Sequence, residues 1–377
     1  MPDMDFEVLI IGGGVVGLAI AAKTAQKYAP IALLERHDSF GQETSSRNSE
    51  VVHAGMYYKT GSLKARLCLE GRRELYQLAE QHHIPYKKSG KIVIALSEFE
   101  SISIEELKLH GEANGVEGLR MLTPEETKKI EPNVSARAAL FSPETGIIDS
   151  HRLMDIFRRI AKHSGADLVF GAAVSGLAPV SGGWEVRYFD AEGEGTVTAR
   201  TVVNAAGLHA QDVMRMAGLK PDAMNLTLHL CKGEYFSVQG QKRKMVNGLV
   251  YPPPHADLVS LGIHTRVDLG GTLRLGPSAF YVDKIDYTVD PVHKSDFLSS
   301  VKPFLPFLEI DDLSPDMAGI RPKLAGPGEP ARDFHIAHEA EHGAPGFFNL
   351  VGIESPGLTA SPAIAGYILS LLSDYLS

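Results

Sequence analysis

The sequence is poor in cysteine and tryptophan, with two cysteines and one tryptophan in 377 residues. Cys68 and Cys231 stand apart from each other and from any CxxC or Cys/His cluster, so we expect no metal site built on them. Two isolated thiols are typical of a reducing compartment, although the sequence alone leaves a disulfide between them open. This usage predicts a cytoplasmic protein.

Positive charge is also scarce. The chain has 37 Lys and Arg against 46 Asp and Glu, a net charge of −9, and no basic run. This composition excludes binding to nucleic acid or an anionic membrane through bulk charge. The apolar run 8–22 contains four glycines and follows acidic residues, so it is neither a signal peptide nor long enough to span a bilayer. We expect no transmembrane segment, with peripheral contact at an inner membrane left open.

Glycine, by contrast, is abundant, at 37 of 377 residues against a usual ~7%. One cluster, Gly12-Gly13-Gly14-Val15-Val16-Gly17, directly follows the apolar segment 6–11, which we expect to be a buried strand. An alanine-rich helix, a second strand at 31–34 and Glu35 come next. A lone GxGxxG is weak evidence, but these parts in this order predict a Rossmann-type dinucleotide site.

Each residue of this fingerprint has a physical task. Gly12 allows the tight turn, Gly14 lets a pyrophosphate approach the backbone, and Gly17 lets the helix pack closely on the strand. The N–H groups at the helix N-terminus face the phosphates, and Glu35 accepts hydrogen bonds from a ribose. The competing interpretation is a glycine-rich turn in an unrelated α/β protein.

The remaining sequence favours FAD over NAD. No second fingerprint with the same context is present, which favours a flavin reduced by the substrate itself rather than by NAD(P)H. A long polar segment at 44–58 also follows Glu35. An FAD that extends from ribose to isoalloxazine needs hydroxyl and amide partners of this kind.

Further motifs are spread over nearly the whole chain. They are TSSRNSEVVHAGMYY (44–58), GSLKARLCLEGRR (61–73), TGIID (145–149), VNAAGLH (203–209), KGEY (232–235), LGIHT (261–265), LGP (275–277), GIR (319–321) and SPGLT (355–359). Together these motifs resemble the FAD-dependent D-amino-acid oxidase-like (DAO) superfamily, most closely its L-2-hydroxyglutarate dehydrogenase/oxidase branch. The chain departs from the family pattern at Glu50, where a glycine is usual, and is shorter between about Pro277 and Asp316.

The resemblance implies an α/β fold in two parts. The first is a Rossmann-like FAD-binding domain with a parallel sheet, discontinuous over 1–83, 145–223 and 332–377. The second is a substrate, or cap, domain with a mixed or antiparallel sheet, over 84–144 and 224–331.

The resemblance also implies a set of FAD contacts, spread over the fingerprint, the polar loop and the segment ahead of the last helix. Residues 355–359 would direct the N-terminus of that helix, 360–376, toward the charge that develops at flavin N1–C2=O. The implied set is Gly12, Gly14, Val15, Val16, Gly17, Glu35, Arg36, Thr44, Ser45, Arg47, Asn48, Ser49, Val52, Val174, Ala205, Ala206, Gly207, Arg321, Glu354, Ser355, Pro356, Gly357, Leu358 and Thr359.

The implied reaction is the oxidation of a small L-2-hydroxy acid, L-2-hydroxyglutarate to 2-oxoglutarate, by hydride transfer from the substrate Cα to flavin N5. The alternative within the superfamily is an amine or amino-acid oxidase like glycine or sarcosine oxidase. A non-enzymatic FAD-binding module is disfavoured by the polar loop and the lack of basic clusters. The sequence leaves open whether O2 or a quinone is the electron acceptor, whether the FAD is covalent, and the oligomeric state.

This reaction needs a base for the hydroxyl proton, for which histidine suits neutral pH. Of 15 histidines, only His53 and His264 lie in the flavin-side motifs. Either is a candidate for the base or for substrate contact. His53 could instead contact the isoalloxazine.

The substrate carboxylate needs a planar, bidentate donor, and we expect Arg321 to supply it. The competing interpretation of Arg321 is a surface salt bridge. A second carboxylate would need a further donor, for which the candidates are Tyr57, Lys59, Tyr251, Arg266 and Arg274.

Outside these motifs, the patterns predict helices at 62–81, 99–114, 151–163 and 293–301. They also predict strands at 84–96 and 257–264, among others. Thr123-Pro124-Glu125-Glu126 has the form of a capping box with proline at the first helical position.

Overall fold

Strand β1 (Phe6–Ile11) lies inside the largest sheet of the computed structural model, which describes residues 3–254 and 261–377. It pairs in parallel with β2 (Ile31–Glu35) on one side and β12 (Gly193–Asn204) on the other. Within the described residues this sheet has eight strands, in the order β10-β11-β12-β1-β2-β9, with β20 beside β12 and β19 beside β20. The other bounds are β9 (Ala166–Phe170), β10 (Ala173–Val180), β11 (Gly183–Asp190), β19 (His335–His338) and β20 (Phe347–Val351).

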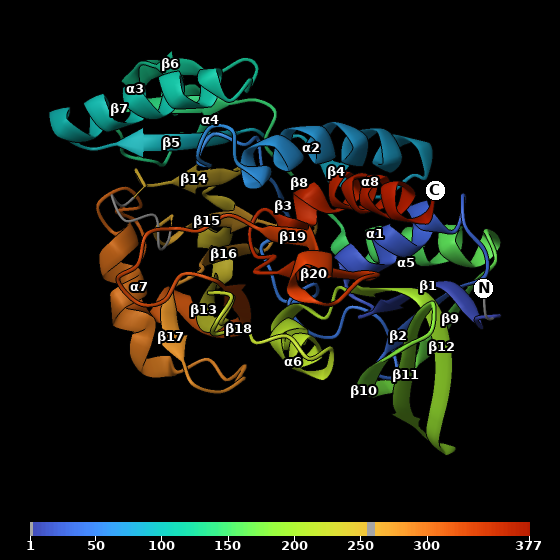
Figure 1. Ribbon diagram of the computed structural model, residues 1–377. Helices are drawn as coiled ribbons and strands as arrows, with labels where there is room; N and C mark the ends of the chain where they lie inside the picture. Colours follow the sequence, from blue (N-terminus) through green and yellow to red (C-terminus); the bar gives the residue numbers. More distant parts are fainter. Residues whose placement is uncertain (1–2, 255–260) are drawn as a thin grey trace.

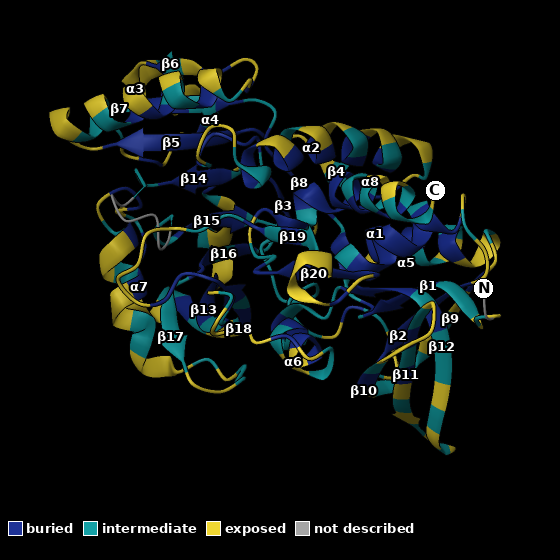
Figure 2. Ribbon diagram, viewed as in Figure 1, coloured by how far each residue is buried: buried dark blue, intermediate teal, exposed yellow. Residues whose placement is uncertain are grey.

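Both faces of β1 are covered, because its side chains alternate between two hydrophobic clusters. Val8 and Ile10 pack into the cluster formed with the long helices, whereas Leu9 and Ile11 pack on the opposite face. Helix α1 contacts α8 and α5, and α2 lies along α8 (Figure 1). The dark blue interior of Figure 2 follows these layers. The helix bounds are α1 (Val15–Thr24), α2 (Leu63–Gln81), α5 (Ser150–His163), α6 (Ala210–Met216) and α8 (Gly357–Leu376).

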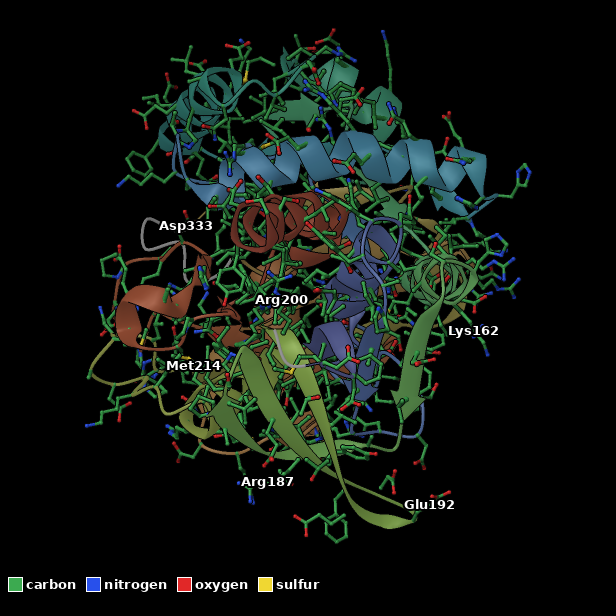
Figure 3. All side chains as sticks on the ribbon, turned by 45° about the vertical axis from the view of Figure 1, so that its right-hand side comes forward. Lys162, Arg187, Glu192, Arg200, Met214 and Asp333 are labelled. Carbon is green, nitrogen blue, oxygen red and sulfur yellow. The ribbon has the colours of Figure 1, made fainter. Side chains whose placement is uncertain are left out.

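The hairpin of β11 and β12 projects from this sheet, with Arg187 and Glu192 on its outer part (Figure 3). Its inner part is anchored in the core by Trp184, which is 1% exposed and donates to the carbonyl of Pro345. The tip is polar and lies far from the strand ends that carry the fingerprint.

The second region consists of a five-stranded sheet, in the order β15-β16-β13-β17 with β18 against β13, and a four-stranded sheet, in the order β14-β5-β7-β6, within the described residues. Helix α7 (Lys294–Val301) flanks the first, and α3 (Glu98–Ala113) and α4 (Pro124–Ile130) flank the second. The strands are β13 (His229–Val238), β15 (His264–Val267), β16 (Leu273–Gly276), β17 (Phe280–Val282) and β18 (Leu313–Lys323), then β5 (Lys91–Ala95), β6 (Arg120–Leu122), β7 (Ala138–Ser142) and β14 (Leu249–Tyr251).

Most predicted elements are confirmed within one to three residues. The four expected helices form as α2, α3, α5 and α7. Helix α4 begins at the expected capping box, in which Glu126 N–H donates to Thr123 Oγ1 and Thr123 N–H donates to Glu126. The α/β fold class is also confirmed.

The single strand expected at 84–96 is wrong. The chain breaks at Gly90, which has a φ of +69°, and forms β4 (Tyr86–Lys87) and β5 instead. The two strands pair differently, since β4 joins β8 (Gly146–Ile148), the middle strand of a small sheet completed by β3 (Val51–Val52), whereas β5 joins β7 and β14. Of the strand expected at 257–264, residues 257–260 lie outside the described residues, and the prediction is wrong for 261–263, because β15 begins only at His264.

The structure also describes the state of the two cysteines, the length and apolarity of the helices and the grouping of side chains that could bind a metal. Cys68 and Cys231 are both buried and free, so the disulfide that the sequence left open does not form. Of the helices in the described part of the chain, none combines the length and apolarity needed to cross a membrane. Within residues 3–254 and 261–377, no group of three or more metal-ligating side chains is placed to hold a metal ion.

Candidate active site

A cavity of about 1590 Å³ lies between the carboxyl ends of β1 and β2 and the strands β13 and β18. Ile11, Gly12 and Glu35 line it from the first side, and Gly233 and Arg321 from the second. The carboxyl edge of a parallel sheet is where α/β proteins bind ligands. The volume exceeds the roughly 300–1,000 Å³ of pockets for one small molecule, so it suits a dinucleotide together with a substrate.

Most residues proposed from the sequence line this one cavity. They come from segments that are hundreds of residues apart in the chain. The lining residues among them are Gly12, Gly14, Val15, Val16, Glu35, Arg36, Thr44, Ser45, Arg47, Asn48, Ser49, His53, Tyr57, Lys59, Val174, Ala205, Ala206, Gly207, Tyr251, His264, Arg321, Glu354, Ser355, Pro356, Gly357, Leu358 and Thr359.

The fingerprint end of the cavity is shaped by the absence of side chains. A Cβ at Gly12 would lie 2.5 Å from the carbonyl oxygen of Ala205, and Gly12 has a φ of +111°. Helix α1 begins at Val15, with Gly14 as its N-cap and no acidic residue in its first turn, and the N–H of Val15 donates to Ser45 Oγ at 3.0 Å. The positive end of this helix therefore carries no acidic residue of its own, which suits an anionic group such as a dinucleotide phosphate.

Glu35 ends β2 at the same edge. Its carboxylate accepts from the backbone N–H of Gly13 at 2.5 Å and from that of His37 at 2.9 Å. These two bonds fix the side chain without using all of the acceptor capacity of its oxygens. Glu35 is thus a pre-oriented acceptor for a hydroxyl in the cavity.

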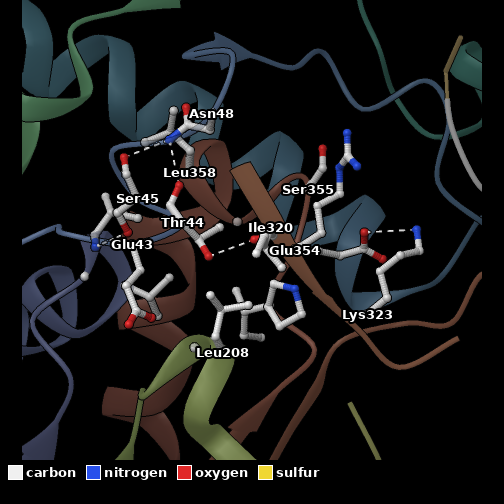
Figure 4. A pocket seen from close by; sticks show the side chains of 18 of the residues that line it. Glu43, Thr44, Ser45, Asn48, Leu208, Ile320, Lys323, Glu354, Ser355 and Leu358 are labelled. Atoms are coloured by element: carbon white, nitrogen blue, oxygen red, sulfur yellow. Dashed lines mark hydrogen bonds and ion pairs between the residues drawn. The ribbon is translucent and has the colours of Figure 1, made fainter. Parts of the chain in front are cut away.

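The polar loop at 44–49 is held by its own side chains, as Figure 4 shows. The Asn48 amide donates to the carbonyls of Thr44 (3.1 Å) and Ser45 (2.7 Å), and Thr44 Oγ1 donates to the carbonyl of Ile320 at 3.0 Å. The loop is therefore tied both to itself and to β18. The guanidinium of Arg47 lies 4.1 Å from the ring centroid of Tyr287, and its buried Nε has no hydrogen-bond partner in the described part of the chain.

A buried charge cluster borders the cavity near the start of α8. Glu354 forms ion pairs with Lys64 at 2.9 Å and with Lys323 at 3.2 Å, and Figure 4 shows the second pair. Burial raises the pKa of Glu354, but the two ammonium groups outweigh it and hold the pKa below its ordinary value. The cluster carries two positive charges against one negative.

The two candidate histidines both line the cavity. Burial, with a smaller contribution from Lys91, lowers the pKa of His53 to about 3. Burial likewise lowers the pKa of His264 to about 3. Both rings are therefore neutral at pH 7, which is the state that can accept a proton.

The tautomer of His264 follows from its contacts. Its Nδ1 lies 2.8 Å from the carbonyl oxygen of Gly262, which can only accept, so Nδ1 carries the proton. Nε2 then has a free lone pair, and this buried atom has no hydrogen-bond partner among the described residues. His53 differs, because its Nε2 lies 3.3 Å from Ser355 Oγ and its buried Nδ1 is the atom for which the described residues provide no hydrogen-bond partner.

Arg321 projects from β18, and the surface salt bridge considered for it does not form. Its guanidinium makes only long contacts, 3.4 Å to the carbonyl of Ser278 and 3.7 Å to Cys231 Sγ. In the described part of the chain no carboxylate pairs with it. A planar guanidinium that has no carboxylate partner of its own suits a carboxylate ligand.

Four of the residues proposed from the sequence do not line the cavity. Val52 is fully buried in β3, and a Cβ at Gly17 would lie 1.9 Å from the carbonyl oxygen of Gly12. Arg266 forms an ion pair with Glu50, and Arg274 pairs with Asp268 and, at 2.7 Å, with Asp316. Both arginines are neutralised by carboxylates, so the structure does not bring them to the substrate side.

Sequence reasoning missed Lys91, the cluster of Lys64 and Lys323, and the role of Tyr235, whose hydroxyl lies 2.7 Å from Ser49 Oγ. The signal for Lys91 was a lysine at the head of the apolar run 92–95. Lys87 and Lys88, earlier in the same segment, are both exposed.

The comparisons with known proteins agree with this site. Residues 7–371 match the family described as "FAD dependent oxidoreductase". The chain is 37% identical to the mitochondrial L-2-hydroxyglutarate dehydrogenase of Arabidopsis thaliana, over 96% of this chain and 82% of the relative. It is 28% identical to L-2-hydroxyglutarate dehydrogenase of Escherichia coli K12, over 99% and 94%.

Solved structures are also similar to this chain over nearly its whole length. The L-α-glycerophosphate oxidase of Mycoplasma pneumoniae, with FAD bound, superposes with a TM-score of 0.86 at 27% identity, over 97% of this chain and 94% of that one. Glycine oxidase of Geobacillus kaustophilus has a TM-score of 0.81 at 23% identity, over 99% and 95%, and shares the fold. The chain therefore belongs to the family of FAD-dependent oxidoreductases.

Proposed function

We propose that this chain is an FAD-dependent L-2-hydroxyglutarate dehydrogenase, which oxidises L-2-hydroxyglutarate to 2-oxoglutarate. The observation that carries the proposal is the guanidinium of Arg321, which has no ion-pair partner among the described residues and lies in the same cavity as two neutral histidines. The relatives from Arabidopsis thaliana and Escherichia coli carry this activity in their names.

The cavity fits FAD on the observations made at its fingerprint end. A dinucleotide with two phosphates suits the N-terminus of α1, which lacks acidic residues, and the close backbone approach that the missing Cβ of Gly12 allows. The oriented carboxylate of Glu35 suits its ribose, and Arg47 Nε, which has no hydrogen-bond partner among the described residues, suits an anion. The FAD-binding residues are those predicted from the sequence that line the cavity. The division into a discontinuous FAD domain and a substrate domain belongs to the same proposal.

Bound FAD supplies the acceptor for the two electrons of the oxidation. The side chains of this protein supply the rest. Arg321 binds the carboxylate next to the carbinol carbon, and the histidine pair takes the hydroxyl proton, since a neutral imidazole is a competent acceptor. The buried walls exclude water, which strengthens both interactions.

The experiment that tests this function is anaerobic reduction of the flavin by a panel of substrates. We expect L-2-hydroxyglutarate to bleach the flavin absorbance, and glycine, sarcosine and L-glutamate to leave it unchanged. The reverse pattern would establish the amine oxidase alternative. Admitting air or a soluble quinone to the reduced enzyme then distinguishes the two electron acceptors left open by the sequence.

Loss of FAD is the expected consequence of Gly12→Ala. The added Cβ meets a backbone carbonyl that cannot move aside, and the positive φ disfavours alanine. We expect affinity for FAD to fall about tenfold or more, measured as flavin content after purification and by titration of the apoprotein. Gly270→Ala is the control, because Gly270 is exposed and an added Cβ would approach only a side-chain oxygen of Asp268, at 3.3 Å. Equal flavin content in the two variants would contradict the proposed pyrophosphate site.

We further propose that the enzyme acts in the cytoplasm. Two buried, unpaired cysteines in a chain of this length support a reducing compartment.

A further inference from the structure

Lys91 is a buried cation with no counter-ion in the described residues. Its side chain extends from the first residue of β5 and is 2% exposed. Nζ donates to the hydroxyl oxygen of Tyr57 at 3.0 Å and lies 4.2 Å and 4.6 Å from the ring centroids of Tyr57 and Tyr251. Both rings line the cavity, whereas Lys91 itself lies behind them.

The contact with Lys91 fixes the role of the Tyr57 hydroxyl. An ammonium group has only donors, so the Tyr57 oxygen must be the acceptor of this bond. The proton of Tyr57 then has to be donated elsewhere, and the described residues offer it no acceptor within hydrogen-bonding distance. A ligand in the cavity is the remaining acceptor, and a donor polarised by a cation suits an anionic one.

Lys91 is linked to His264 through the ring of Tyr251. The ring of Tyr251 contacts Lys91 and also stacks on His264, with centroids 3.6 Å apart. Burial is the main cause of the low pKa of His264, and Lys91 and Arg321 both lower it further, so each cation acts on this ring. The cavity therefore offers carboxylates two separate donors, the hydroxyl of Tyr57 polarised by Lys91 and the guanidinium of Arg321.

We propose that Lys91 is a positioning residue, which orients and polarises Tyr57 to bind the distal carboxylate of a dicarboxylate substrate while Arg321 binds the proximal one. This inference rests on the proposed function and identifies the side chains that select a dicarboxylate substrate. It assigns selectivity for dicarboxylates over monocarboxylates to a side chain that does not touch the substrate.

The contact between Lys91 and Tyr57 makes the affinity for a dicarboxylate depend on pH. Burial lowers the pKa of Lys91 to about 7, and nearby Cys68 opposes the shift. Binding of a carboxylate at Tyr57 favours the charged form and raises this pKa. Above pH 7, binding then takes up a proton, so the Kd for a dicarboxylate rises with pH there and is constant below. Several titratable or charged groups surround Lys91. They are Cys68 from α2, Tyr57 and His53 from the segment after β3, Tyr251 from β14 and His264 from β15. Arg72 is also near but is paired with Glu117, and Glu131 lines a second, small pocket together with Lys91.

The test measures binding of glutarate and butyrate to the oxidised holoenzyme, by perturbation of the flavin spectrum. These two acids differ by one carboxylate and lack the reacting hydroxyl group. We expect Lys91→Met to weaken glutarate about 10- to 100-fold, the loss of a charge-assisted hydrogen bond, and butyrate less than about threefold. Tyr57→Phe should reproduce this loss, and the double variant should add little to either.

Two controls separate this role from general changes of charge or fold. Lys244→Met makes the same charge change on an exposed residue and should leave both affinities unchanged. Glu131→Gln removes the other nearby group with a pKa of about 7 and should preserve the rise of the glutarate Kd above pH 7. Lys91→Met should abolish that rise.

Equal weakening of glutarate and butyrate by Lys91→Met would overturn the proposal, as would a pH-independent glutarate Kd in the unmodified enzyme. If Lys91→Met does not fold, Tyr57→Phe decides by the same comparison. Failure of the proposed function is a separate result, since it would appear as an unbleached flavin in the presence of L-2-hydroxyglutarate while glutarate binding still reports on Lys91.

Discussion

Replacement of Arg321 by methionine is expected to raise the KM for L-2-hydroxyglutarate about 100-fold or more, because a carboxylate in a desolvated site loses its only bidentate partner. The guanidinium is unpaired in the described part of the chain, so no internal ion pair is broken by the change. Steady-state kinetics and the glutarate Kd both measure this effect. Arg321→Lys should recover only part of the loss, since an ammonium group cannot form the two parallel hydrogen bonds.

Arg187→Met is the matched control for Arg321, since Arg187 is exposed on the projecting hairpin (Figure 3). It should leave KM and kcat unchanged. A KM for the Arg321 variant within threefold of the unmodified value would remove Arg321 from the site. A loss of FAD instead of substrate affinity would move its role to the cofactor.

Replacement of the histidine that acts as the base is expected to have the second large effect, on the rate of flavin reduction. One of the two variants His53→Gln and His264→Gln should lower the rate of flavin reduction by about 10²- to 10⁴-fold, the usual contribution of general base catalysis. The glutarate Kd of that variant should stay within a few-fold of the unmodified value, because the base acts on the hydroxyl proton. Retained rates in both variants would show that the proton leaves by another route.

The pH profile gives an independent check on the base. Since burial lowers the pKa of both histidines to about 3, the neutral form persists well below the ordinary pKa of histidine. The acid limb of kcat/KM should therefore stay flat from pH 7 down to about pH 5, whereas an unshifted histidine would lose activity below its ordinary pKa of ~6.5. A tenfold fall between pH 6.5 and 5.5 would contradict this environment.

The dinucleotide end of the site could be predicted from the sequence because its determinants are contiguous. Gly12, Gly14 and the start of α1 are neighbours in the chain, and their geometry follows from local backbone constraints. The same holds for the capping box at Thr123. Local patterns of this kind need no knowledge of the tertiary structure.

The substrate end could not be predicted in the same way, because its charges are assigned by pairs across the fold. Arg266 and Glu50 lie 216 positions apart, and their pairing removes Arg266 from the cavity. Glu50 keeps a φ of +54°, a backbone region that glycine adopts freely. Lys91, at the head of an apolar strand, acquires its role only when β14 and the segment after β3 bring two tyrosines to it.

The most direct test of the central claim is an anaerobic titration of the purified holoenzyme with L-2-hydroxyglutarate, with 2-oxoglutarate quantified at each point. We expect one 2-oxoglutarate to form for each FAD bleached, and the D-enantiomer to give neither product nor bleaching. A flavin that stays oxidised with L-2-hydroxyglutarate would contradict the proposed activity. So would a flavin that an amino acid bleaches, if the hydroxy acid yields no 2-oxoglutarate.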